Sequence, residues 1–232
     1  DELAEVAGVG AYVKDITAKA MNGELDFEGA LTERVALLSG LDEDIIAQVL
    51  AERITLMSGG PALLATMKAH GAYAALVSGG FTAFTASIAS KLGFDENRAN
   101  ILFAEGGKLT GKVAMPILGR EAKVQALEEI TARLGIAEQD VLAVGDGAND
   151  LDMIERAGLG IAFNAKPVVR DAADAAINVP YLDTVLYLMG ISREEVEEAD
   201  AGRVEHQLEE PARLGGPGPR QDLGLNPSEV EL

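Results

Sequence analysis

Apolar residues recur at steps of three and four positions through the N-terminal part of the chain. Val13 and Ile16 show this spacing, and Leu31 and Val35 repeat it further along. Such spacing places apolar side chains on one face of a helix, and no run typical of a strand interrupts it. The pattern therefore predicts a helical segment, which we assign to residues 1–54 as a small helical cap.

From Pro61 onward the pattern changes to helices that alternate with short apolar strands. Each predicted strand is followed by small or acidic residues, and the strands are expected at 74–77, 141–144, 160–163 and 175–179. Helices are expected at 61–69, from residue 81 onward and at 121–134, and a β-hairpin is expected where 101–103 and 108–113 flank Gly106 and Gly107. This alternation is typical of an α/β fold with a Rossmann-like parallel sheet, which we assign to residues 55–191.

The segment 192–232 has a different composition. From Arg193 on it holds four of the eight prolines and eleven acidic residues against four basic ones, with a Gly-Gly-Pro-Gly-Pro run at 215–219. Such a segment buries little apolar surface. We expect it to be an acidic, Gly/Pro-rich and disordered tail beyond a short helix.

Charge and composition limit the function. A formal net charge of −19 disfavours binding to nucleic acid phosphates and to anionic membrane surfaces, so a small-molecule substrate is favoured. There is no apolar run near the roughly 20 residues that cross a bilayer. The printed chain has no cysteine and two histidines, which leaves carboxylates, hydroxyls and amines as the chemical groups. We expect a soluble, cytoplasmic protein.

The most specific motif is the loop Gly-Asp-Gly-Ala-Asn-Asp at 145–150, directly after a predicted strand and before a helix. Ligands of parallel α/β sheets bind at the carboxyl ends of strands. An aspartate there is a suitable oxygen ligand for Mg²⁺, and glycines let a phosphate approach the backbone. The alternative is a turn whose Asn and Asp cap the next helix.

A second loop has the same strand-to-helix placement. Ser78, Gly79 and Gly80 follow the strand at 74–77, where a hydroxyl and backbone N–H groups at a helix N-terminus suit an anion. The alternative is a glycine turn in which Ser78 is the N-cap of the following helix. Lys123 opens the helix before the strand at 141–144, and it either neutralises a phosphate or belongs to a solvated helix face.

The order of these motifs resembles the phosphoserine phosphatases of the haloacid dehalogenase superfamily over about residues 1–190. The resemblance includes 21–27 in the helical segment and Asn-Ala-Lys-Pro at 164–167. P-type ATPases of the same superfamily share the 145–150 motif, but the chain has no apolar run that could form their membrane helices. The resemblance implies a haloacid dehalogenase-like hydrolase core with a helical cap.

The resemblance also implies roles for individual residues. Asp146 would ligate Mg²⁺, Lys123 would neutralise the phosphate and the nucleophile, and Asp150 would hold Lys123 or the waters of the metal in place. The residues that would contact substrate are Ser78, Gly79, Lys123 and Asn149 in the core, and Arg34, Phe27 and Met21 in the cap. Arg34 would pair with the substrate carboxylate.

The printed sequence departs from the family at one place. The family's first strand ends in D-x-D-x-T, with the first aspartate as nucleophile and the second as general acid and base, and we expect it before Asp1. The strings at 42–44 and 150–152 do not directly follow a predicted strand, so neither is expected to be the nucleophile. The printed chain is therefore expected to be an inactive and less stable part of the enzyme, with unpaired strand edges where the missing strand belongs.

The function implied by the resemblance is the Mg²⁺-dependent hydrolysis of O-phospho-L-serine through a phospho-aspartyl intermediate, the last step of serine biosynthesis. Two alternatives stay open. One is a non-catalytic module that binds phosphate or phosphoserine. The other is a related phosphomonoesterase or phosphotransferase that acts on another small substrate.

Overall fold

The computed structural model describes residues 2–21 and 26–209. Four helices come first, as the apolar spacing predicted: α1 (Glu2–Val6), α2 (Gly10–Met21), α3 (Phe27–Ala36) and α4 (Asp44–Glu52). The carboxylate of Asp26 caps α3 by accepting the backbone N–H of Gly29 at 2.6 Å. Phe27 is thereby fixed as the first residue of this helix.

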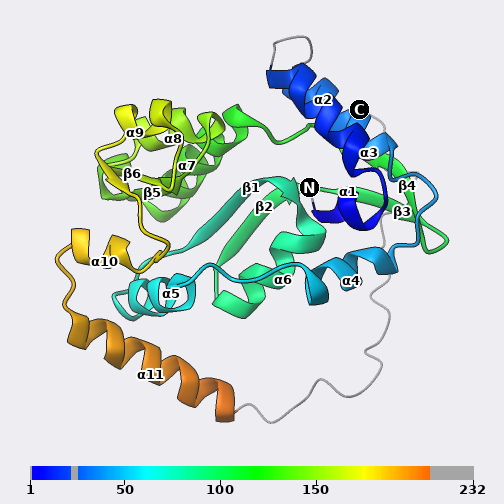
Figure 1. Cartoon of the computed structure of the whole chain (residues 1–232). Helices are drawn as coiled ribbons and strands as arrows, with labels where there is room; N and C mark the ends of the chain where they lie inside the picture. The colour runs from blue at the N-terminus through cyan, green and yellow to red at the C-terminus, as the bar shows by residue number, and fades with distance from the viewer. Residues whose placement is uncertain (1, 22–25, 210–232) are drawn as a thin grey trace.

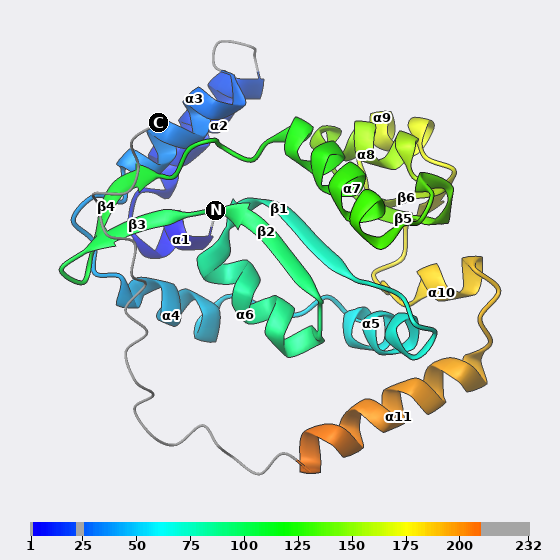
Figure 2. The same cartoon turned by 180° about the vertical axis from the view of Figure 1, so that it is seen from behind.

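The hairpin packs against these helices although it lies far along the chain. It consists of β3 (Leu102–Glu105) and β4 (Lys108–Val113), paired antiparallel as predicted. Leu109 of β4 shares a buried cluster with Leu3, Leu38 and Val49 of the helical segment. The two segments are seen side by side in Figures 1 and 2. The helical segment therefore builds its core together with a piece of chain from the predicted α/β region.

The first parallel pair is β1 (Ala75–Phe81) with β2 (Glu96–Asn100), flanked by α5 (Gly60–Ala69) and α6 (Thr82–Leu92). Strand β1 is longer than expected. Residues 78–80, which were predicted to form a loop, belong to its C-terminal end. Strand β2 was not predicted, since its sequence Glu-Asn-Arg-Ala-Asn has no apolar run. It is held by parallel pairing with β1 and by charged side chains.

The second parallel sheet has the order β5-β6-β7. Its strands are Leu142–Gly145, Leu159–Phe163 and Ala175–Ile177, and its helices are α7 (Arg120–Leu134), α8 (Leu151–Arg156) and α9 (Pro167–Ala172), with 3₁₀ turns at Glu138–Asp140 and Ala148–Asp150. Ile161 and Ala162 of β6 are fully buried. The predicted strands and helices of this region are confirmed, with ends that differ by one or two residues.

The two parallel sheets are separate. Within the described residues, β1 pairs with β2 alone and β5 pairs with β6 alone, so each has one edge without a strand partner. In both views β1 lies on the side of its sheet that faces β5 and β6 (Figures 1 and 2). The unpaired edges expected from the sequence are therefore present.

The end of the described chain packs onto α5. After α10 (Thr184–Leu188), α11 (Arg193–Glu209) lies alongside α5 and buries Val196 in the main cluster with Leu63 and Leu64. The short helix expected in the tail is thus 17 residues long, and the rest of that tail, 210–232, lies outside the described residues. None of the helices in the described part is long and apolar enough to cross a membrane.

Candidate active site

The loop after β5 is organised by Asp150. This residue is 3% exposed, and its Oδ2 accepts the backbone N–H groups of Asp146 at 3.1 Å and Gly147 at 3.0 Å. The carboxylate reaches back over the end of β5, where a Cβ added to Gly145 would lie 2.5 Å from Asp150 Cγ. Glycine at 145 is therefore required by the close approach of this side chain.

Lys123 is the charge partner of Asp150. It lies in the first turn of α7, it is 8% exposed, and its ammonium pairs with Asp150 Oδ1. A buried ammonium needs such a partner because desolvation of an unpaired charge is costly. The resemblance implied that Asp150 holds either Lys123 or the waters of the metal, and the structure has the contact with Lys123. This contact fixes α7 to the loop at 145–150.

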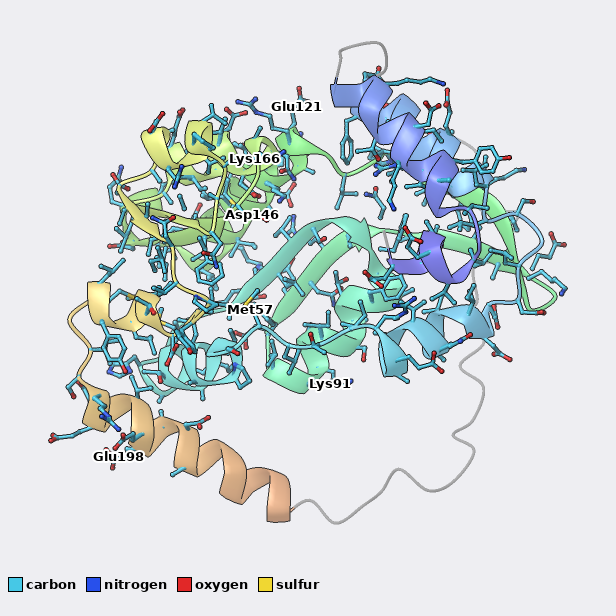
Figure 3. The ribbon with its side chains drawn as sticks, viewed as in Figure 1. Met57, Lys91, Glu121, Asp146, Lys166 and Glu198 are labelled. Atoms are coloured by element: carbon cyan, nitrogen blue, oxygen red, sulfur yellow. The ribbon has the colours of Figure 1, made fainter. Side chains whose placement is uncertain are left out.

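Asp146 and Asn149 occupy the outer side of the same loop. Asp146 is exposed, and its carbonyl accepts the backbone N–H of Lys166 at 3.3 Å. Figure 3 shows Asp146 and Lys166 close together at this end of the β5–β6 sheet. Asn149 is half-buried, and its Oδ1 lies so near Gly147 that a Cβ there would be 2.4 Å away.

The donor set suits a hard cation only in part. An exposed aspartate is a suitable oxygen ligand for Mg²⁺, while the Asp150 carboxylate is engaged by Lys123 and two N–H groups. The described residues contain no group of three histidine, cysteine or acidic side chains placed to hold a metal. Of these two carboxylates, that of Asp146 is therefore the one that would be open to a cation.

The loop at Ser78–Gly80 is a bulge in β1. Val77 pairs with Arg98 and Phe81 with Asn100, so three residues of β1 face one residue of β2. Ser78 Oγ accepts the backbone N–H of Gly80 at 3.0 Å, and α6 begins at Thr82 without a side-chain cap. The bulge thus brings a hydroxyl and backbone groups to the N-terminus of a helix, which is a favourable place for an anion.

Phe27 of the helical segment lies on this bulge. A Cβ added to Gly79 would meet the Phe27 ring at 3.2 Å, and one added to Gly119 would meet it at 3.1 Å. The ring is 39% exposed, so it also faces solvent. The structure therefore brings together two predicted residues, Phe27 and Gly79, from segments that are 52 positions apart.

Arg34 lies seven positions after Phe27 on α3, which places both on one side of that helix. Its Nε donates to the carbonyl of Ala30 at 3.2 Å, and partial burial lowers the pKa of its guanidinium. Within the described residues it has no carboxylate partner within ion-pair distance. Met21 ends α2, and its side chain lies outside what the structure describes.

Asn100 is a residue that the sequence analysis missed. It is 1% exposed at the end of β2, and its amide contacts the backbone of both Gly79 and Leu118. A polar residue at the end of a strand that has no apolar pattern gives no distinctive signal in a sequence. Only the parallel pairing of β1 with β2 places it against the bulge.

Comparison with known proteins decides the family. Residues 5–155 match the model of the haloacid dehalogenase-like hydrolases, which is more than half of the chain. The chain belongs to this family. The α/β fold predicted from the alternation of helices and strands is the fold of these hydrolases, and the resemblance noted in the sequence is confirmed.

Within the haloacid dehalogenase-like hydrolases, the chain is similar to phosphoserine phosphatases. It is 50% identical over 204 residues to the one from Streptomyces coelicolor, covering 86% of this chain and 50% of that protein. It is 45% identical over 193 residues to the one from Albidiferax ferrireducens, covering 81% of each. The chain thus spans half the length of the first relative and most of the second.

A solved structure of a haloacid dehalogenase-like hydrolase has the same fold. It is described as a phospho-aspartyl intermediate analogue of phosphoserine phosphatase, and it is 42% identical with a TM-score of 0.75. The match covers 83% of this chain and 90% of that one. The similarity therefore extends over nearly all of the described residues.

Proposed function

We propose that this chain supplies the phosphate-binding residues and the cap of a phosphoserine phosphatase, which hydrolyses O-phospho-L-serine to L-serine and phosphate with Mg²⁺. The observation that carries the proposal is the position of the Phe27 ring, from the helical segment, over the bulge, 3.2 Å from where a Cβ on Gly79 would lie. A covered anion site of this kind suits a small phosphate ester. The identity to phosphoserine phosphatases over most of the chain supports the substrate.

The charges of the site suit phosphoryl transfer. Lys123 would balance the negative charge on the phosphoryl oxygens, and the carboxylate of Asp150 keeps this ammonium in place at the loop. Ser78 and Gly79 would donate to the phosphoryl oxygens from the bulge, with Asn149 as a further contact. Asp146 would be the carboxylate of this chain that holds Mg²⁺, which when bound neutralises charge on the phosphate.

The nucleophile would be an aspartate on a strand that pairs with both β1 and β5. The unpaired edges of these two strands support this part of the proposal, because a parallel strand between them would end beside Ser78 and Asp146. Its carboxylate would attack phosphorus while the serine oxygen leaves with a proton. Water would then cleave the acyl phosphate and regenerate the aspartate.

Selection of the amino acid would belong to the cap. Arg34 carries a partly desolvated guanidinium that suits a planar, bidentate bond to the carboxylate of serine. Phe27, with Met21, would close over the seryl carbons. A cytoplasmic location is part of the proposal.

The test is phosphate release from O-phospho-L-serine with Mg²⁺ by two proteins. One is the printed chain, and the other carries an added N-terminal apolar strand that ends in D-x-D-x-T. We expect turnover only with the added strand, and none when its first aspartate is replaced by asparagine. A chain that binds phosphoserine without turnover in either form would instead be a non-catalytic binding module.

Arg34→Ala tests the substrate. In the strand-bearing protein this change should weaken use of O-phospho-L-serine by about 10²-fold, while p-nitrophenyl phosphate, which has no carboxylate, should change little. Little change on either substrate would point to a general phosphomonoesterase, and an equal loss on both would mean that Arg34 does not recognise the carboxylate.

A further inference from the structure

The side chain of Asn100 joins two backbone segments that are distant in the sequence. Its Nδ2 donates to the carbonyl of Gly79 at 3.1 Å and to that of Leu118 at 3.2 Å, and its Oδ1 accepts the N–H of Leu118 at 2.7 Å. At 1% exposure these bonds replace bonds to water. The amide therefore uses both of its donor hydrogens and its acceptor on backbone groups.

The first of these segments is the bulge. Because three residues of β1 face one residue of β2, the regular pairing is interrupted between Val77 and Phe81. The Gly79 carbonyl is instead bonded by the side chain of Asn100. The amide of Asn100 therefore helps to fix the shape of the bulge, together with the bond from the Gly80 N–H to Ser78 Oγ.

The second segment leads into α7. Leu118 and Gly119 directly precede this helix, and Lys123 lies in its first turn. Asn100 bonds both the N–H and the carbonyl of Leu118, and these bonds, together with the one to Gly79, are called the clamp below. The clamp fixes where α7 begins. Asn100 thus links the bulge to the start of the helix that carries Lys123, although within the described residues it hydrogen-bonds neither Ser78 nor Lys123.

The clamp also forms the surface on which Phe27 rests. The ring contacts Gly79 and Gly119, the residues at or beside the two points that Asn100 holds. If Gly79 and Leu118 moved apart, the two glycines would no longer form one seat for the ring. The position of the cap over the bulge therefore depends on the same amide.

We propose that Asn100 is a positioning residue, which holds the anion-binding bulge, the start of α7 and the seat of Phe27 in one arrangement. The part that concerns phosphate rests on the proposed function. The part that concerns the Phe27 seat does not, because it is a property of the protein without ligand.

The variant Asn100→Asp separates positioning from packing, because it keeps the shape of the side chain. As a carboxylate it can still accept the Leu118 N–H, but it presents an oxygen to the carbonyls of Gly79 and Leu118 and repels them. When protonated it can donate to one of them. Burial favours the protonated form and can raise the pKa of a buried carboxyl group to about 8–9, so the clamp should be lost above that range, at about pH 10, and partly return at about pH 5.

The readout is the set of nuclear Overhauser contacts between the Phe27 ring and the α-protons of Gly79 and Gly119 in the printed chain. We expect these contacts to be lost in Asn100→Asp at high pH and to reappear at low pH. Thr85→Val is the control. Thr85 of α6 is also buried, and it donates to Asn97, which lies on β2 with Asn100. Within the described residues its side chain bonds neither Gly79 nor Gly119. Contacts that persist in Asn100→Asp at high pH would overturn the proposal.

A measurement on the unchanged protein guards against a variant that does not fold. The Leu118 amide hydrogen should exchange at least about tenfold more slowly than the hydrogen of an exposed loop amide, because it is bonded to Asn100 inside the structure. Free exchange at this amide would refute the clamp without any variant.

Titration with inorganic phosphate and Mg²⁺ then separates the two proposals. The unchanged chain and Thr85→Val should bind alike, and Asn100→Asp should bind about tenfold more weakly at high pH. Absence of phosphate binding by the unchanged chain, with the Phe27 contacts intact, would count against the proposed function. Equal binding by all three proteins would refute the role of Asn100 at the phosphate.

Discussion

The carboxylate of Asp150 pairs with the ammonium of Lys123 through one oxygen and accepts the N–H groups of Asp146 and Gly147 through the other. A single buried side chain thus connects the start of α7 with the loop after β5. This arrangement gives two of the predictions that follow.

Asp150→Asn should lower the free energy of unfolding by about 3–5 kcal/mol, because it leaves the buried Lys123 ammonium without its counter-charge. Asp152→Asn is a matched control: Asp152 also pairs with an α7 residue, Arg120, but the two side chains are 42% and 49% exposed, so the cost should stay below about 1 kcal/mol. Urea unfolding followed by circular dichroism measures both. Equal costs for the two variants would contradict the structural role of the buried pair.

Gly145→Ala should disturb the same loop through a steric clash, without any change in charge. The new Cβ would lie 2.5 Å from Asp150 Cγ, so the carboxylate must move off its N–H donors. We expect a loss of about 1–3 kcal/mol of stability and shifted amide resonances for Asp146 and Gly147. Gly202→Ala, where a Cβ meets nothing within 4 Å, should be neutral or stabilising. Unchanged loop resonances in Gly145→Ala would rule out this crowding.

Glu96 should make stability depend on acid pH. Hydrogen bonds from Arg133, and also from Arg98 and Tyr73, lower the pKa of Glu96 from 4.5 to about 2. Because the pKa of Glu96 is lowered in the folded state, its ionised carboxylate stabilises that state at pH values above 4.5. This contribution is lost as the pH falls toward about 2.

Glu96→Gln should therefore be less stable than the unchanged protein near neutral pH, and the difference should shrink as pH falls from 4.5 toward about 2. Thermal or urea unfolding at a series of pH values measures it. Glu121→Gln, at an exposed position, serves as the control. A difference that is constant across this range would show that the charge of Glu96 contributes nothing.

Val196→Ala should show that α11 is part of the folded unit. Val196 is 6% exposed in the cluster with Leu63 and Leu64, so its truncation should cost about 1–3 kcal/mol. Glu198→Ala on the exposed side of α11, labelled in Figure 3, should stay within about 0.5 kcal/mol. If both variants unfold at the same urea concentration, α11 does not contribute to the core.

The sequence predicted those elements whose apolar pattern is local. The strand at Leu142–Gly145 and the helix at Arg120–Leu134 were expected because their own residues carry the period. The pairing of Lys123 with Asp150 was expected from the family resemblance, and the structure forms it. Such features depend on short stretches of chain.

Strand β2 and Asn100 could not be predicted in this way. The strand Glu96–Asn100 is polar, and its partners are the backbone of β1 and charged residues of α7. Asn100 acquires its contacts only when Gly79 and Leu118 are brought together by the fold. The information that defines them lies in tertiary contacts, which local periodicity does not contain.

The division into two parallel sheets has a consequence for how the protein opens. No ladder of backbone hydrogen bonds crosses from β1 to β5 within the described residues. The two halves are joined by the apolar cluster that Leu63 and Leu64 of α5 share with Ile161 and Phe163 of β6. Ion pairs such as Arg98 with Glu129 and Arg133 with Glu96 add to this contact. Side-chain ion pairs are screened by salt, whereas backbone ladders are not. The ion-paired part of the coupling between the two halves should therefore weaken as ionic strength rises, and faster amide exchange in β2 and α7 at high salt would measure it.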